Sequence, residues 1–295
     1  MRPAFTLIEM IFVIIIAAVL SLGSFKAMQA LFIRSAKAKA VSELSLRSQI
    51  VLDQLGSILY HRINNSVIGY TPGDTCEPIT DLSVSRPVLE WLGTMDDALL
   101  QRRYDGFIDL GDSNRSSATL AAPTIDATLN NTNINLIFSG SLDDGSDETV
   151  SACSGAFGWH GNSSRLSYDV NIGNNTLSIT DTVQPQFIYE KYYLSNTAYA
   201  VARGADVSNL SHCAYDTSLL KDVDTTLFLF YNYRPFKGET FCADGGVGDV
   251  SVLAEDVSAF RAESVNDALI LSIDMNRSIR GSQSAVRISK QKVVF

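Results

Sequence analysis

The sequence predicts an α+β fold in which one long amino-terminal helix packs against an antiparallel β-sheet head, with room for a second sheet. Two observations support this prediction. No proline occurs between Pro3 and Pro72, so a helix that begins near the amino terminus is free to continue for many turns. From residue 134 onward, short apolar or alternating runs are separated by clusters of Gly, Asn, Asp and Ser, a pattern typical of antiparallel strands joined by turns. We expect the helix at residues 5–60 and the head at residues 61–295.

The first part of the predicted helix is an apolar segment of membrane length. The 16 residues from Met10 to Phe25 carry no charge, and the apolar character continues to Ile33 with Lys26 and Gln29 as the polar interruptions. A helix needs about 20 residues to cross roughly 30 Å of hydrocarbon, so we expect a transmembrane helix. A signal peptide is the alternative. Against it, the carboxylate of Glu9 would cost about 3 kcal/mol in an apolar environment unless it is paired, and a disposable peptide has no need for it.

The residues from Ala4 to Glu9, followed by an aliphatic helix, resemble the cleavage and methylation site of type IV pilins and of type II secretion pseudopilins. The resemblance implies that residues 1–4 are a leader, that cleavage falls between Ala4 and Phe5, and that Phe5 becomes N-methylated. The family usually has glycine where this chain has Ala4. Phe5 and Glu9 are four residues apart and share one face of a helix. The resemblance implies that Glu9 neutralises the amino terminus of a neighbouring subunit in a filament.

The resemblance also implies a place in the cell and a set of partners. The chain would be a single-pass protein of the bacterial inner membrane, with its head in the periplasm, and would be incorporated into a pilus or pseudopilus. Its partners would be other pilins or pseudopilins, contacted through the helix, together with prepilin peptidase and the inner-membrane assembly platform. An uncleaved signal anchor is the alternative. The residues do not choose among secretion, twitching and competence machines.

The second half of the predicted helix is amphipathic. Charged residues alternate with apolar ones that recur at spacings of three, four and seven, which predicts one buried helical face. This face is expected to pack under the head and to consist of Val41, Leu44, Ile50 or Val51, Leu55, and Ile58 or Leu59.

The charge differs between the helix and the head. Residues 1–60 contain six Lys or Arg and three Asp or Glu, whereas residues 61–295 contain 17 and 29, so the net charges are +3 and −12. Nucleic-acid binding depends on Lys and Arg side chains that neutralise phosphates. We therefore expect no direct nucleic-acid binding by the acidic head.

The head is expected to be built mostly from strands. Residues 83–110 have a weaker helical or irregular character, and the pair Asn174-Asn175 reads as a hairpin turn. The predicted strands are Ile134 to Phe138, Leu166 to Ile172, Thr176 to Ile179, Phe187 to Tyr193, Ala198 to Ala202, Thr226 to Tyr233, Val250 to Leu253 and Ala268 to Asp274.

The carboxyl-terminal region from Val252 to Met275 resembles the closing strand pair of the larger minor pilins and pseudopilins, the group similar to the J-type pseudopilin. The length of 295 residues agrees with this group, because major subunits are commonly much shorter. This resemblance implies a minor subunit at or near the tip of the filament. The competing class is a binding module: a pilus-displayed adhesin, or a receptor for substrate or for DNA uptake.

All four cysteines lie in the head: Cys76, Cys153, Cys213 and Cys242. An even number of cysteines outside a membrane anchor indicates an oxidising compartment in which two disulfides form. Of the three pairings, we favour Cys213 with Cys242, which encloses the predicted strand from Thr226 to Tyr233, and Cys76 with Cys153. Free buried thiols are the alternative. Zinc is disfavoured because the chain has no C-x-x-C pair and only three histidines.

Motifs for catalysis are incomplete. Gly111-Asp112-Ser113 resembles the nucleophile block of a lipase-like hydrolase family, but no histidine follows His212 to act as its base. The glycines at 245, 246 and 248 do not precede a Lys-Ser or Lys-Thr pair, so they form no phosphate loop. We expect no enzymatic activity. An anchored enzyme, with Ser113 as the nucleophile, is the alternative that an activity assay would reveal.

Two further motifs concern modification and metal binding. Asn114 and Asn276 each stand in an acidic-x-Asn-x-Ser context that resembles the acceptor of bacterial N-glycosylation. We expect no cofactor. The one candidate for calcium is an acidic loop, for which a solvated loop without metal is the preferred interpretation, formed by Asp143, Asp144, Asp147 and Glu148.

Overall fold

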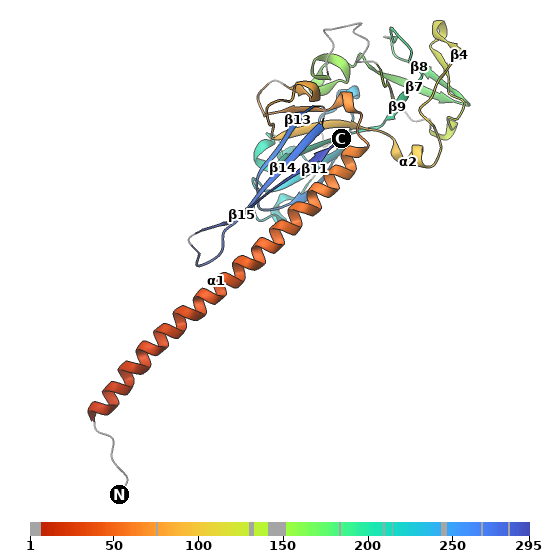
Figure 1. The fold of residues 1–295 in the computed structure, drawn as a ribbon. Coiled ribbons are helices and arrows are strands. Elements are labelled where there is room, and N and C mark those ends of the chain that lie inside the picture. Colours follow the sequence, from red (N-terminus) through yellow and green to blue (C-terminus); the bar gives the residue numbers. More distant parts are fainter. Residues whose placement is uncertain are drawn as a thin grey trace.

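The computed structural model describes residues 7–74, 76–129, 133–140, 152–182, 184–208, 210–213, 215–242, 247–266, 268–282 and 284–295. Figure 1 shows one long helix, α1 (Leu7–Tyr60), whose second half lies against a β-rich head. The predicted α+β fold is therefore confirmed. The described strands form three sheets, one more than the sequence led us to expect.

The helix α1 is a continuous rod of 54 residues, about 80 Å long at 1.5 Å per residue. Its buried residues all lie in the second half: Ala40, Leu44, Ser48, Val51, Leu52, Leu55 and Leu59. The predicted face was wrong at Val41, which is 43% exposed, and of the alternatives Ile50 and Val51 it is Val51 that is buried. The small side chains of Ala40 and Ser48 take part instead, because they allow the sheet to come close to the helix.

The main sheet has six antiparallel strands in the order β12-β11-β10-β3-β1-β2. Residues 83–110 were expected to have a weaker helical or irregular character, but they contain β3, a central strand of this sheet in which every residue is buried. One face of the sheet packs toward α1 through Leu89 and Trp91, and the other packs around Phe157 and Trp159. The strands are β1 (Ile68–Tyr70), β2 (Glu77–Pro78), β3 (Val88–Gly93), β10 (Thr197–Arg203), β11 (Leu227–Tyr233) and β12 (Asp249–Ala254).

A second sheet joins the carboxyl-terminal strands to α1. It consists of β13 (Val257–Val265), β14 (Ala268–Arg277) and β15 (Val286–Val294), in that order. The strand pair expected in the tail corresponds to β13 and β14, whereas β15 was not predicted. β15 runs alongside α1: Lys292 Nζ lies 2.7 Å from Asp53 Oδ1, and Lys290 Nζ donates to Gln49 Oε1 at 3.3 Å. The two lysines are two residues apart on the strand, about 7 Å, and their partners are four residues apart on the helix, about 6 Å, so the two spacings match.

The third sheet belongs to a segment inserted between β3 and β10. Figure 1 shows it to the side of the main sheet, beyond the short helix α2 (Asp96–Leu100). Asn175, with φ of +58°, lies in the turn between β7 and β8, as the predicted hairpin requires. The strand expected at 187–193 is displaced toward the carboxyl terminus, where it forms β9. In sheet order the strands are β4 (Asp109–Asn114), β5 (Thr119–Ala121), β8 (Thr176–Ile179), β7 (Ser167–Gly173), β6 (Asn135–Phe138) and β9 (Tyr192–Ser195).

Candidate functional site

The first half of α1 is an apolar surface with no cover. Every side chain from Leu7 to Phe32 is exposed, and this helix is long and apolar enough to cross a membrane. Exposure of so many large apolar side chains to water is unfavourable, at about 25 cal/mol per Å². The structure therefore supports the predicted membrane anchor in its coarser form, a single apolar helix of spanning length at the amino terminus.

Glu9 lies in the first turn of α1 and its side chain is exposed. The next acidic residue along the helix is Glu43, 34 positions further on. Ala4 and Phe5, the residues of the predicted cleavage site, lie outside the described residues. The predicted cleavage, methylation and shared face of Phe5 and Glu9 therefore stay predictions.

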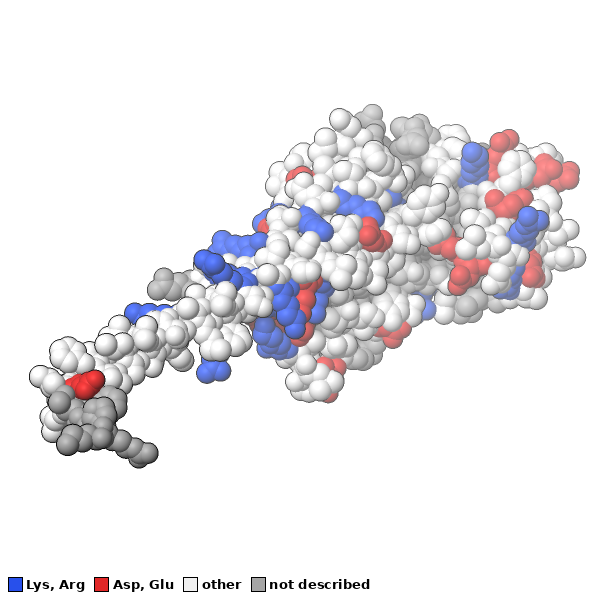
Figure 2. All heavy atoms as spheres, turned by 60° about the horizontal axis from the view of Figure 1, so that its bottom comes forward, with Lys and Arg blue, Asp and Glu red and all other residues white. Residues whose placement is uncertain are grey.

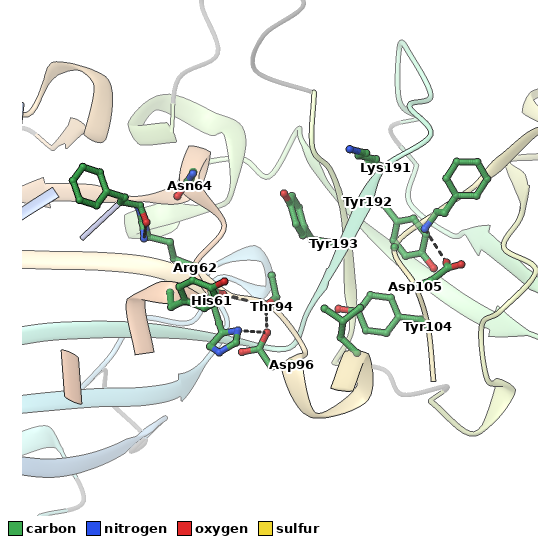
Figure 3. A pocket seen from close by; sticks show the side chains of 15 residues that line it. His61, Arg62, Asn64, Thr94, Asp96, Tyr104, Asp105, Lys191, Tyr192 and Tyr193 are labelled. Atoms are coloured by element: carbon green, nitrogen blue, oxygen red, sulfur yellow. Dashed lines mark hydrogen bonds and ion pairs between the residues drawn. The ribbon is translucent and has the colours of Figure 1, made fainter. Parts of the chain in front are cut away.

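A pocket of about 520 Å³ lies where the end of α1, the inserted segment and the end of β15 meet. Figure 3 shows His61, Arg62 and Asn64 on one side of the pocket and Tyr104, Asp105 and Tyr193 on the other. His61 Nδ1 lies 3.0 Å from Asp96 Oδ1, and Thr94 donates a hydrogen bond to the same carboxylate, as the dashed lines show. The volume is in the range of small-molecule sites, about 300 to 1,000 Å³.

Two polar atoms on the wall of this pocket are buried without a partner in the described structure: Arg62 Nε and Tyr192 OH. Arg62 is 8% exposed, and its Nη1 donates to the main-chain oxygens of Leu59, at 2.8 Å, and Phe295, at 3.4 Å. Burial lowers the pKa of Arg62 and raises that of Tyr192. A buried polar group without a partner costs about 1 to 3 kcal/mol.

A buried carboxylate holds together a cluster of side chains on the face of the main sheet that lies away from α1. Glu90 in β3 is 1% exposed and accepts a hydrogen bond from Tyr233 OH at 2.7 Å, and its Oε1 lies 3.0 Å from His160 Nε2. The ring of Tyr70 packs edge-on against His160, with centroids 4.7 Å apart. The hydrogen bond to Glu90 raises the pKa of His160, whereas burial and the same carboxylate raise the pKa of Tyr70. Sequence analysis did not identify this cluster.

Both disulfides that the sequence favoured are present. Cys76 pairs with Cys153 and Cys213 pairs with Cys242, and the described structure contains no free cysteine. The first bond ties the loop before β2 to the segment that carries His160. The second closes a loop around β11. Together they cross-link the face of the main sheet that lies away from α1.

The residues that the sequence suggested for catalysis, glycosylation or metal binding form no site within the described residues. Ser113 Oγ donates to the main-chain oxygen of Asp109 and accepts from the Ala121 amide, so both of these partners are backbone groups rather than a base. Asn276 lies inside β14, whereas Asn114 is exposed at the end of β4. No group of three His, Cys, Asp or Glu side chains in the described parts of the chain is arranged to hold a metal. The acidic loop proposed for calcium lies outside the described residues: Asp143, Asp144, Asp147 and Glu148.

Comparison of the chain with protein-family models, with curated proteins and with solved structures found no significant match.

Proposed function

We propose that this chain is a minor pilin or pseudopilin, a structural and non-enzymatic subunit of a type II secretion pseudopilus or a type IV pilus-like filament. The observation that carries the proposal is the division of α1. One face of its second half packs against the head, whereas its first half exposes a membrane-length apolar surface that begins with Glu9. Two environments can cover such a surface: a lipid bilayer, and a bundle of the same helices from other subunits.

Glu9 is the residue on which assembly depends in this proposal. Inside a bundle of apolar helices the carboxylate would be costly without an opposite charge close by. The amino terminus of a neighbouring subunit, freed by cleavage before Phe5, supplies that charge. The pair would then fix the axial position of each helix relative to the next.

The first prediction concerns this pair. Glu9→Leu is expected to leave the protein folded and inserted in the membrane but to lower its amount in sheared filaments at least about ten-fold, because the amino terminus of the neighbour then lies unpaired in an apolar bundle. Glu9→Asp is the matched control, since it keeps the charge. Immunoblots of the filament and membrane fractions measure both. Normal incorporation of Glu9→Leu would contradict the proposed pairing of Glu9 with the amino terminus of a neighbour.

Intact-mass and amino-terminal peptide spectrometry on the same membrane preparations tests the processing. A chain that begins with N-methylated Phe5 supports the pilin pathway. A chain that begins at Met1 is instead a signal anchor, and a cut beyond the apolar segment indicates a secreted protein.

The pocket at the end of α1 favours a second function, a receptor head displayed on the filament. Its volume of about 520 Å³ and its mixed aromatic and polar lining suit a small-molecule ligand. Tyr193 lines this pocket and is 38% exposed. If the head is a receptor, Tyr193→Ala is expected to assemble normally and to reduce adherence or uptake by the assembled filament. Unchanged adherence and uptake in this variant would leave the structural role as the function of the chain.

A further inference from the structure

A second groove, of about 270 Å³, lies where the loop between β14 and β15 meets α1. Its helix side is apolar and its loop side carries Arg280 and Gly281. The loop is held against the helix, because Lys37 Nζ donates to Ser284 Oγ at 3.0 Å. The helix residues that line the groove are Phe25, Met28, Gln29, Phe32 and Ile33.

The groove lies at the level where a bilayer would end. If the hydrocarbon begins near Leu7, about 20 residues of helix cross roughly 30 Å and reach Lys26, the first charged residue after Glu9. The groove begins at Phe25, so it falls in the headgroup region on the side of the head. Figure 1 shows the β14–β15 loop reaching along α1 toward the apolar half.

The charges around the groove are all positive. Residues 10–42 contain no Asp or Glu, and their four charged residues are Lys26, Arg34, Lys37 and Lys39. Arg280 is exposed and forms no ion pair within the described part of the chain. Figure 2 shows basic side chains along the exposed part of the helix and the adjoining edge of the head, whereas acidic ones gather at the far end. The local charge is therefore opposite in sign to that of the head as a whole.

We propose that this groove binds an anionic phospholipid of the bilayer that α1 spans. The upper methylenes of the lipid would lie on Phe25, Phe32 and Ile33, and the phosphate would bind Arg280 together with the cations of the helix. A free phosphate would leave the apolar wall uncovered. The helix of a second copy would bring its own four cations to the same level, where like charges repel. The inference needs only that α1 spans a membrane, and it holds whether or not the chain enters a filament.

The test uses the full-length protein in detergent, titrated with phosphatidylglycerol or phosphatidylcholine of identical acyl chains. Native mass spectrometry counts the lipids that remain bound. Wild type is expected to retain phosphatidylglycerol at least about five-fold more than phosphatidylcholine, and Arg280→Gln to lower that retention about five-fold, the effect of one basic residue near an anionic surface. Arg287→Gln, an exposed arginine of β15 outside the groove, is the matched control and should not change it.

Three outcomes would overturn the inference. Equal retention of the two lipids, or an Arg280→Gln variant that behaves as wild type, would show that the groove does not recognise the headgroup. Displacement of bound lipid by millimolar inorganic phosphate would make it a phosphate site. A dimer peak in place of the lipid adduct would identify a second copy as the occupant. Glu9→Leu should keep the lipid, so a failure of the filament proposal is distinguishable from a failure here.

Discussion

At the residue scale, the carboxylate of Glu90 joins parts of the head that are far apart in the sequence. It holds Tyr233 of β11 and His160 of the segment that Cys153 ties to Cys76. The carboxylate of Glu90 and the ring of Tyr70 lie against His160, and the phenol of Tyr233 bonds to the same carboxylate. The phenols are neutral at physiological pH, because burial beside this carboxylate raises the pKa of both. His160 is thus the group of the cluster whose raised pKa bears on stability.

The pair of His160 with Glu90 makes stability depend on pH. The pKa of His160 is raised above 6.5 in the folded protein, so its contribution is fully present below that pH and is lost as pH rises through the folded pKa. Because the side chain is 37% exposed, we expect the loss to be about 1 kcal/mol or less. The measurement is the free energy of unfolding of wild type and of His160→Asn between about pH 6 and about pH 8.

His160→Asn suits this experiment because His160 has φ of +55° and Asn accepts that backbone conformation. The variant should show a flatter dependence of stability on pH than wild type. Parallel pH profiles of the two proteins would show that the pair with Glu90 contributes nothing to stability. Sequence reasoning had no means of finding this pair, since Glu90 and His160 are 70 residues apart and meet only through the packing of the sheet.

At the element scale, the second half of α1 has one face packed against the head and one face exposed. Leu55 is fully buried between the helix and the sheet of β13, β14 and β15, whereas Leu46 is 63% exposed nine residues earlier. Both are leucines on the same helix, so they offer a matched comparison.

Leu55→Ala is expected to lower the free energy of unfolding of the head by about 2 to 5 kcal/mol, because it leaves a cavity in the core. Leu46→Ala should change it by less than about 0.5 kcal/mol. Denaturant unfolding in detergent, followed by the near-ultraviolet circular dichroism of the buried tryptophans, measures both. Equal effects of the two substitutions would contradict the described packing of α1.

The strands differ in how readily the sequence predicts them. β6, β7, β8, β10, β11, β12 and β14 were predicted because an apolar or alternating run next to turn residues marks each of them. β3 was missed because Glu90 interrupts its apolar run. β15 was missed because Lys290 and Lys292 stand on its inward side, where their ammonium groups bond to α1 instead of to solvent. The pocket beside Arg62 is built from four separate chain segments, so no local pattern predicts it.

At the scale of the whole molecule, the cysteines bear on the compartment in which the head lies. Two disulfides cross-link the head, and disulfides persist in oxidising compartments. The two disulfides therefore fit a head held outside the reducing cytoplasm.

This location can be measured with thiol chemistry. In protein taken from its host and denatured without reduction, a maleimide-polyethylene glycol reagent is expected to add to none of the four cysteines, and after reduction to all four. Loss of the Cys213–Cys242 disulfide should cost about 3.6 kcal/mol and loss of the Cys76–Cys153 disulfide about 4.5 kcal/mol, given loops that span 29 and 77 residues. Labelling of the unreduced protein would place the head in a reducing compartment and contradict the proposed periplasmic location.

The alignment of β15 with α1 also determines how the molecule responds to tension. Contacts from Lys37 to Asp53 lie one after another along the helix, so a pull along its axis acts parallel to the interface and loads all of them together in shear. A load perpendicular to the interface would instead peel them apart singly, at a much smaller force. Since α1 contains no internal proline, it transmits such a pull without a hinge from Leu7 to the core of the head. A pull on the amino-terminal end of α1 therefore moves the head as one body.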